Sequence, residues 1–243
     1  GKTVQEGGAH YNFTGPQGFG IANMADGLWA VKTLVFDEKK VSMAELKDAL
    51  IHNYGQGLSP KAAKNATQEV VINLAKAGKS VTESQVADIC RMFLTGEQDP
   101  TKRKRYEEIL DMINELPKYG NDIEEIDMLA RDVANIYAKE LEKHKNPRGG
   151  MFQAGLYPVS ANVPLGEQTG ATPDGRLANT PIADGVGPRQ GADTKGPTAA
   201  ANSVAKLEHG RASNGTLYNQ KFHPSALSGN AGLQNFASYI RAF

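Results

Sequence analysis

The chain has 243 residues and a mass of 26.1 kDa, with 40% hydrophobic and 22% charged residues. This length and composition exclude a fibrous or disordered protein and allow one large or two small globular domains. Lys and Arg together number 27, as do Asp and Glu, so the net charge is zero and the positive field of a nonspecific nucleic-acid binder is missing. The single cysteine cannot form an internal disulfide, and these residues show neither the apolar h-region typical of a signal peptide nor an apolar run of about 18 residues for a membrane span.

The N-terminal part of the chain is predicted to be helical. Apolar residues recur at steps of three and four over residues 22–35, which indicates a largely buried helix. Ser42 and Glu45 have the spacing of a capping box and predict the start of a second helix, which ends near Tyr54 and Gly55.

Three further helix starts follow, at Ser59-Pro60, at Thr82 with Gln85, and at Asp99-Pro100. Apolar positions of the first two helices predict a small antiparallel bundle; they are Val70, Val71, Leu74, Val86, Ile89, Met92 and Phe93. The basic run 102–105 is interpreted as a solvated helix face, because the net charge is zero. An amphipathic pattern over residues 126–141 predicts a long helix that ends before Asn146-Pro147.

Glycine and proline become frequent from Arg148 onward, which predicts a loop-rich second half. Short strands are expected over residues 153–163 and 215–220, with a final helix from about Leu233. Long ordered loops are usually functional, so any chemistry is expected in this half of the chain.

The common catalytic and metal-binding patterns are missing from the sequence. The histidines lack the spacing of a zinc site, and there is no Cys-x-x-Cys; they are His10, His52, His144, His209 and His223. Cys90 lies among apolar helical residues and is interpreted as a buried structural thiol. Residues 15–20 precede a helix but lack the spacing and the lysine of a phosphate-binding loop. Residues 172–176, Thr-Pro-Asp-Gly-Arg, are interpreted as a turn.

A more specific indication of the protein family comes from the residue-by-residue sequence of six segments. They are residues 7–18, 118–122, 146–150, 169–176, 196–199 and 214–224. In this order they resemble the glycyl radical enzymes of the pyruvate formate-lyase-like family. Residues 11–17 and 155–160 are most similar to the B12-independent glycerol and propane-1,2-diol dehydratases of that family. Hydroxyproline dehydratase and formate acetyltransferase are the alternatives within it.

The resemblance implies an α/β fold in which the chain is part of a ten-stranded glycyl radical enzyme barrel. Its first half would be helix-rich and its second half loop-rich. Residues 1–243 would then form one partial pyruvate formate-lyase-like domain. Because the family's connection between Asn53 and Lys118 is short, a helical insertion is expected at about residues 56–105, with a role in contacts between subunits.

The resemblance also implies an activity, the dehydration of glycerol or propane-1,2-diol to an aldehyde by radical chemistry. In the family, a radical-SAM activating enzyme installs a glycyl radical, and the radical takes hydrogen from a cysteine thiol. The family's Gly-Cys-Val-Glu-Pro and Arg-Val-Ala-Gly-Tyr-Ser loops are expected before residue 1 and beyond Phe243. The chain is therefore expected to be a fragment with no catalytic residue, bound cofactor or metal of its own. The alternative from another class of function is a catalytically inactive structural or assembly module.

Substrate-binding residues carried over from the resemblance are Tyr157, Pro158, Val159 and Ser160. Tyr157 would be a pocket-wall tyrosine, and Pro158 and Val159 an apolar wall that limits substrate size. Alternation along a strand makes Ser160 and Asn162 weaker candidates, since only one side of a strand faces a barrel interior. The expected partners are the diol, the activating enzyme and a second copy of the chain in a homodimer, with no nucleic acid and no membrane. The expected location is the cytoplasm, with a bacterial microcompartment as the alternative.

Overall fold

The structure, a computed structural model, describes residues 1–242 and divides into two compact units. Unit 1 comprises Gly1–Asp26, Pro117–Asn162 and the chain from Ile182 onward. Unit 2 comprises Gly27–Leu116 and Val163–Pro181. Within the described residues, no helix combines the length and the apolar character needed to cross a membrane.

The first predicted helix is confirmed as two consecutive segments. The α-helix α1 (Ile21–Ala30) continues directly into the π-helical segment η1 (Val31–Asp37). Leu34 of η1 is buried, as the apolar periodicity predicts, but Met24 and Leu28 of α1 are exposed, so the predicted burial of this helix is incomplete.

Both predicted capping boxes are present at helix starts. At α2 (Met43–Ile51), Ser42 Oγ accepts a hydrogen bond from Glu45 N at 3.1 Å, and Glu45 Oε2 accepts one from Ser42 N at 2.8 Å. The bond from the Ser42 backbone is the largest cause of a lowered pKa for Glu45. Thr82 and Gln85 form the same reciprocal pair at α4 (Glu83–Thr95). The short η2 (Asn53–Gly55) follows α2, where the sequence predicts the helix end.

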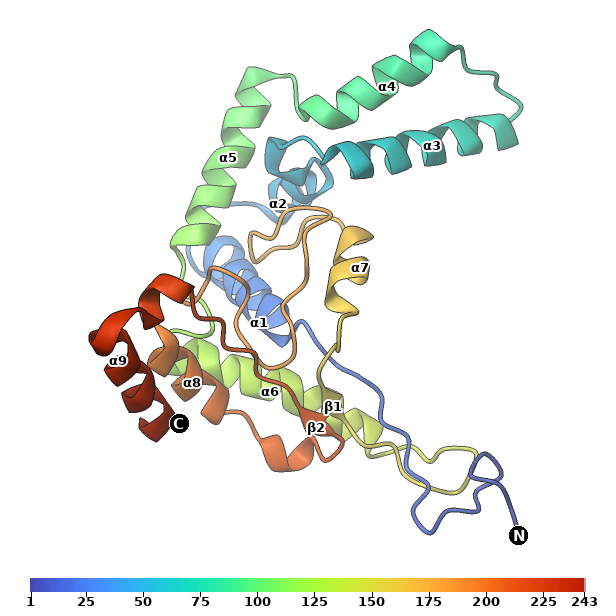
Figure 1. Cartoon of the computed structure of the whole chain (residues 1–243). Coiled ribbons are helices and arrows are strands. Elements are labelled where there is room, and N and C mark those ends of the chain that lie inside the picture. The colour runs from blue at the N-terminus through green and yellow to red at the C-terminus, as the bar shows by residue number, and fades with distance from the viewer. Residues whose placement is uncertain (243) are drawn as a thin grey trace. The chain divides into compact units, whose positions relative to one another are not determined.

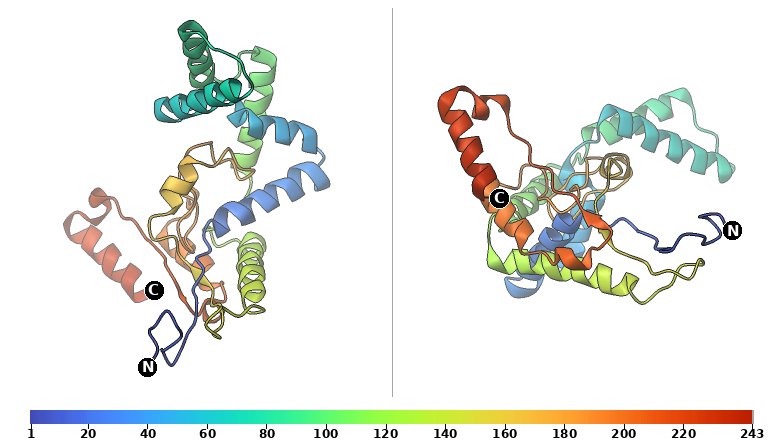
Figure 2. Two further views of the ribbon diagram at one scale, coloured as in Figure 1. Left: turned by 90° about the vertical axis from the view of Figure 1, so that its right-hand side faces the viewer. Right: turned by 60° about the horizontal axis from the view of Figure 1, so that its bottom comes forward.

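Two helices begin with proline at the first turn, as predicted. Ser59 caps α3 (Pro60–Lys76) and Asp99 caps α5 (Pro100–Glu115). Helix α3 packs against α4, and both views of Figure 2 show the two helices side by side, which confirms the predicted pair. Cys90 of α4 is only half-buried, so its predicted burial is incomplete. The helical insertion itself stays a prediction.

The core of unit 2 gathers the helices before and after this pair. Leu46 of α2, buried Tyr54 of η2, and Ile109 and Ile113 of α5 belong to one apolar cluster. Tyr54 Oη donates to Thr172 O at 2.9 Å and so ties the loop after α7 (Asn162–Glu167) to that core. In the basic run of α5, residues 102–104 are exposed, as a solvated face requires.

The predicted turn at residues 172–176 is confirmed, and its arginine is buried. Gly175 N donates to Thr172 O at 3.0 Å and closes the turn. Arg176 is 2% exposed and donates to the carbonyl oxygens of Gly170, Leu177 and Thr180, the last at 2.7 Å. The guanidinium therefore organises the surrounding loop of unit 2 from within.

Unit 1 contains the long predicted helix, α6 (Glu124–Leu141), and the C-terminal helices. The latter are α8 (Pro197–Ala205), η3 (His209–Arg211), η4 (Pro224–Leu227) and α9 (Gly229–Ala242). The final helix begins four residues before the expected Leu233. Lys206, after α8, contacts the buried Asp127 of α6 at 2.9 Å and Asp122 at 2.8 Å, which joins the two helices.

The strands are shorter than predicted. Strand β1 (Gly155–Leu156) pairs in parallel with β2 (Gly215–Thr216), as Figure 1 shows. A strand over residues 153–163 is wrong, because Pro158 removes a backbone donor, Val159 has a φ of 57°, and α7 begins at Asn162. A strand over 215–220 is wrong beyond Thr216. In the described part of the chain the sheet has these two strands, and the ten-stranded barrel stays a prediction.

We predict that Arg176→Lys lowers the free energy of unfolding by about 2–4 kcal/mol. The lysine ammonium cannot reproduce the planar fork, so buried carbonyl oxygens lose their donors. Chemical denaturation of the protein that carries this chain measures the change.

Arg91→Lys is the matched control, because Arg91 is exposed and pairs with Asp88 one turn away on α4. Its effect should stay within about 0.5 kcal/mol. Equal losses for the two variants would contradict a special role for Arg176.

Candidate functional site

A third segment runs along one side of β1. Gly155 N donates to Pro16 O at 3.0 Å, and Gly18 N donates to Gly155 O at 2.7 Å. Parallel bridges link Thr14 with Phe152 and Gln17 with Gly155. Residues 14–18 therefore lie beside β1 in the same parallel direction.

Strand β2 occupies the other side of β1. Asn214 N donates to Ala154 O at 3.0 Å, and Leu217 N donates to Leu156 O at 3.2 Å. Leu217 O in turn accepts a bond from Val186 N at 3.0 Å. Strand β1 is thus the centre of a small parallel arrangement within unit 1.

The four sequence-predicted site residues directly follow β1. Ligand sites of parallel sheets form at the carboxyl ends of the strands, where loops carry the side chains. Residues 157–160 occupy that position. The structure therefore places them where a parallel strand would present a binding site.

These four residues differ in burial. Tyr157 is half-buried and Pro158 is buried. Val159 is 71% exposed, and Ser160 is also exposed. The structure thus brings Tyr157 and Pro158 into the packed part of unit 1 and leaves the next two side chains at its surface.

Val159 combines an exposed apolar side chain with an unusual backbone. Its φ of 57° lies in the left-handed region, which a β-branched residue rarely adopts. Such conformations cost about 1–3 kcal/mol and cluster at functional sites. The strain and the exposure both distinguish Val159 from an ordinary loop residue.

Tyr157 is held by Asn214, which begins the family-like segment 214–224 but is not among the predicted site residues. Its Oη accepts a hydrogen bond from Asn214 Nδ2 at 2.7 Å. A Cβ on Gly155 would lie 2.7 Å from Tyr157 Cε1, and a Cβ on Gly15 would lie 2.1 Å from Asn214 Nδ2. Glycines on the neighbouring segments therefore make room for this pair. Only the three-dimensional pairing of β1 with β2 reveals it.

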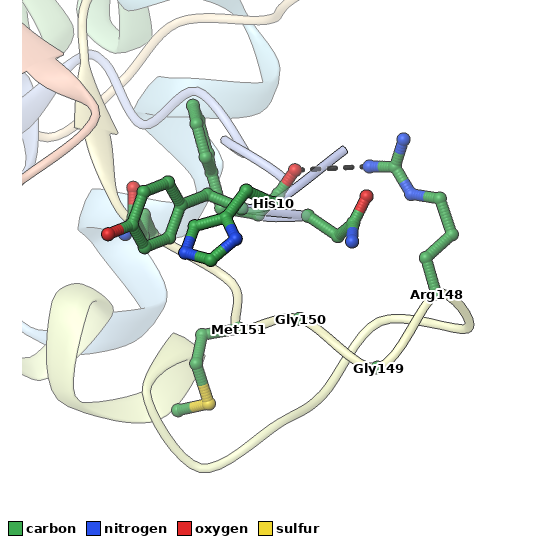
Figure 3. A pocket seen from close by; sticks show the side chains of 9 residues that line it. His10, Arg148, Gly149, Gly150 and Met151 are labelled. Atoms are coloured by element: carbon green, nitrogen blue, oxygen red, sulfur yellow. Dashed lines mark hydrogen bonds between the residues drawn. The ribbon is translucent and has the colours of Figure 1, made fainter. Parts of the chain in front are cut away.

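A second feature is a pocket of about 460 Å³ formed by two segments far apart in the sequence. Residues 10–13 line it with Arg148, Gly149, Gly150, Met151 and Gln153. Figure 3 shows Arg148 reaching across to the Phe13 carbonyl oxygen, a bond of 3.0 Å. His10 is one of the lining residues, and it has no sequence signal because a lone histidine does not have the spacing of a metal site. Among residues 1–242, no group of three His, Cys, Asp or Glu side chains could hold a metal ion.

The buried Asn146 holds these two segments together. Its Nδ2 donates to Asn12 O and to Thr14 Oγ1, the latter at 3.0 Å. Its Oδ1 accepts from Arg148 N and Gly150 N, both at 3.0 Å. The Asn146 side chain thus donates two hydrogen bonds and accepts two.

The ring of Tyr137, on α6, packs against the segment of residues 14–18. A Cβ on Gly18 would lie 2.6 Å from Tyr137 Cε1, so only glycine fits beneath the ring. Burial raises the pKa of Tyr137, which keeps its phenol neutral at neutral pH. Tyr137 therefore supports the segment by packing.

Comparison with known families gives two matches along the chain. Residues 1–166 match the family model described as pyruvate formate lyase-like, and residues 182–243 match the model described as glycine radical.

Two curated relatives are similar over nearly the whole chain. The trans-4-hydroxy-L-proline dehydratase of Clostridioides difficile is 33% identical, covering 100% of this chain and 25% of the relative. The (2S)-3-sulfopropanediol dehydratase of Klebsiella oxytoca is 34% identical, covering 99% of this chain and 24% of the relative. The chain thus spans about a quarter of the length of these relatives.

Solved structures include more similar proteins. The structure described as 1,2-propanediol dehydration in Roseburia inulinivorans is 61% identical with a TM-score of 0.83, covering 99% of this chain and 29% of that one. The glycerol-bound B12-independent glycerol dehydratase from Clostridium butyricum is 46% identical with a TM-score of 0.73. The match covers 99% of this chain and 24% of that one.

We predict that Asn146→Asp lowers the free energy of unfolding by about 2–4 kcal/mol. The carboxylate cannot donate to Asn12 O or Thr14 Oγ1, and a buried charge is added beside those acceptors. Thermal and chemical unfolding measure the loss.

Asn65→Asp makes the same chemical change at an exposed position of α3 and should have almost no effect. An Asn146→Asp protein as stable as this control would show that the amide does not join the two segments.

Proposed function

The chain belongs to the pyruvate formate lyase-like family of glycyl radical enzymes, and we propose that it is part of an enzyme that dehydrates a small diol to an aldehyde. The diol is propane-1,2-diol or glycerol. One observation carries this choice: identity is 61% with the propanediol-dehydrating protein and 46% with the glycerol dehydratase, against 33% with the hydroxyproline dehydratase, all over at least 98% of the chain.

The proposed reaction is redox-neutral overall. One hydrogen is taken from C1 and is finally returned to C2. The C2 hydroxyl leaves as water with the proton of the C1 hydroxyl, and an aldehyde forms at C1. In the family, the glycyl radical takes hydrogen from a cysteine thiol, and the cysteine then takes the C1 hydrogen of the substrate. The radical-bearing string Arg-Val-Ala-Gly-Tyr-Ser does not occur among the 243 residues, so we assign no radical step to them.

The residues of this chain would bind and orient the diol and keep water from it. Tyr157, at the carboxyl end of β1, offers a phenol to a substrate oxygen. Pro158 and Val159 form an apolar wall that limits substrate length, and Ser160 extends the lining. The exposed Val159 with its left-handed backbone supports this role, because its side chain is available for contact.

The proposal includes the partners of such an enzyme. They are a radical-SAM activating enzyme and a second copy of the protein in a homodimer. The helical segment at about residues 56–105 would contribute contacts between subunits. The site of action would be the cytoplasm or a bacterial microcompartment.

The direct test is an assay of the activated enzyme that carries this chain. We expect an aldehyde from propane-1,2-diol or glycerol, detected by NADH oxidation with a coupled alcohol dehydrogenase. Trans-4-hydroxy-L-proline should give no turnover. Turnover of hydroxyproline without turnover of either diol would reject the proposed substrate class.

A second prediction concerns substrate size. Val159→Ala should shift the kcat/KM ratio of butane-1,2-diol to propane-1,2-diol upward by about tenfold, because the shortened wall admits another methylene. Val163→Ala, on the exposed side of α7, should leave the ratio unchanged. A ratio that is the same in the wild-type and Val159→Ala enzymes would remove Val159 from the wall.

A further inference from the structure

We propose that Asn214 is a positioning residue that directs the Tyr157 proton toward the substrate, so that Tyr157 donates the hydrogen bond it makes there. This inference rests on the proposed function only in taking Tyr157 to contact substrate. It assigns a role to a side chain on the neighbouring strand segment, 57 positions away in the sequence.

The first step is the polarity of the contact between the two side chains. A phenol has one proton to donate and lone pairs to accept with. Asn214 Nδ2 donates to Tyr157 Oη at 2.7 Å, so the amide occupies an accepting position of the phenol. The phenol proton is then left for another acceptor.

The second step is that the amide is fixed in place. Asn214 N donates to Ala154 O at 3.0 Å, so the residue is anchored to the chain just before β1. A Cβ on Gly15 would lie 2.1 Å from Asn214 Nδ2, and one on Gly155 would lie 2.8 Å from the same atom. The amide thus lies directly against the backbone of both neighbouring segments.

The third step concerns the phenol ring. A Cβ on Gly155 would lie 2.7 Å from Tyr157 Cε1, so the ring lies over a strand position that has no side chain. Ring and amide are therefore packed on the same glycine. Loss of the amide donor would free the hydroxyl to accept as well as donate.

The chemical consequence is a constraint on the ligand. The atom opposite Tyr157 Oη is favoured if it accepts a hydrogen bond, as the oxygen of a diol hydroxyl does. A protonated amine has no lone pair and could not use the phenol proton. Asn214 would thereby act on specificity through Tyr157 without touching the substrate.

The test compares Asn214→Asp, Asn214→Leu and Tyr157→Phe in the activated enzyme, with the substrate that the wild-type enzyme turns over. The aspartate is close to asparagine in shape but accepts the Tyr157 proton, whereas the leucine only removes the donor. We expect kcat/KM to fall about tenfold or more for Asn214→Asp and about threefold for Asn214→Leu. In the Tyr157→Phe background, neither change should lower kcat/KM further by more than about twofold.

Asn230→Asp, on the exposed surface of α9, is the matched control and should match the wild-type enzyme. A structural role alone would predict equal losses in the wild-type and Tyr157→Phe backgrounds, and that result would overturn the inference.

Normal kcat/KM in both Asn214 variants, with a loss in Tyr157→Phe, would overturn it while keeping Tyr157 at the substrate. If Asn214→Asp does not fold, the Asn214→Leu comparison decides. No loss in Tyr157→Phe would reject the substrate contact and this inference together, whereas turnover of hydroxyproline instead of a diol would reject only the proposed substrate.

Discussion

Strand β1 is hydrogen-bonded along both edges, and the remaining features of unit 1 depend on this pairing. Residues 14–18 bind one edge and β2 binds the other, all in parallel. Gly15, Gly18 and Gly155 leave room for side chains that lie over these segments, namely those of Asn214, Tyr137 and Tyr157. The strands are short, but the pairing fixes which loops meet at their carboxyl ends.

This pairing explains how family-like segments that are far apart in the sequence come together in the structure. Residues 7–18, 146–150 and 214–224 are distant in sequence, yet all three contribute to unit 1 around β1. Asn146 links the first two, and Asn214 links the third to Tyr157. Amides suit these roles because one side chain can both donate and accept. This region is therefore held by backbone pairing, by two amides and by the Arg148 guanidinium that reaches the Phe13 carbonyl oxygen.

Local signals predicted the helices well, whereas long-range contacts set the strands and the site. Ser42 with Glu45 and Thr82 with Gln85 specify helix starts within four residues, so the sequence alone sufficed. Alternation over residues 153–163 suggested a long strand, but β1 ends at Leu156, and Pro158 and the left-handed Val159 prevent its continuation. The contact of Asn214 with Tyr157 has no local signature, because it exists only after β1 and β2 pair. The position of Tyr157 came from the family resemblance and not from spacing.

The central claim is that the carboxyl end of β1 faces the substrate. A crystal structure of the unactivated protein that carries this chain, with propane-1,2-diol or glycerol bound, tests it most directly. The account predicts a diol oxygen within hydrogen-bonding distance of Tyr157 Oη and a diol carbon against Val159. A diol bound at a place remote from residues 157–160, with the Tyr157 hydroxyl turned toward solvent, would contradict it.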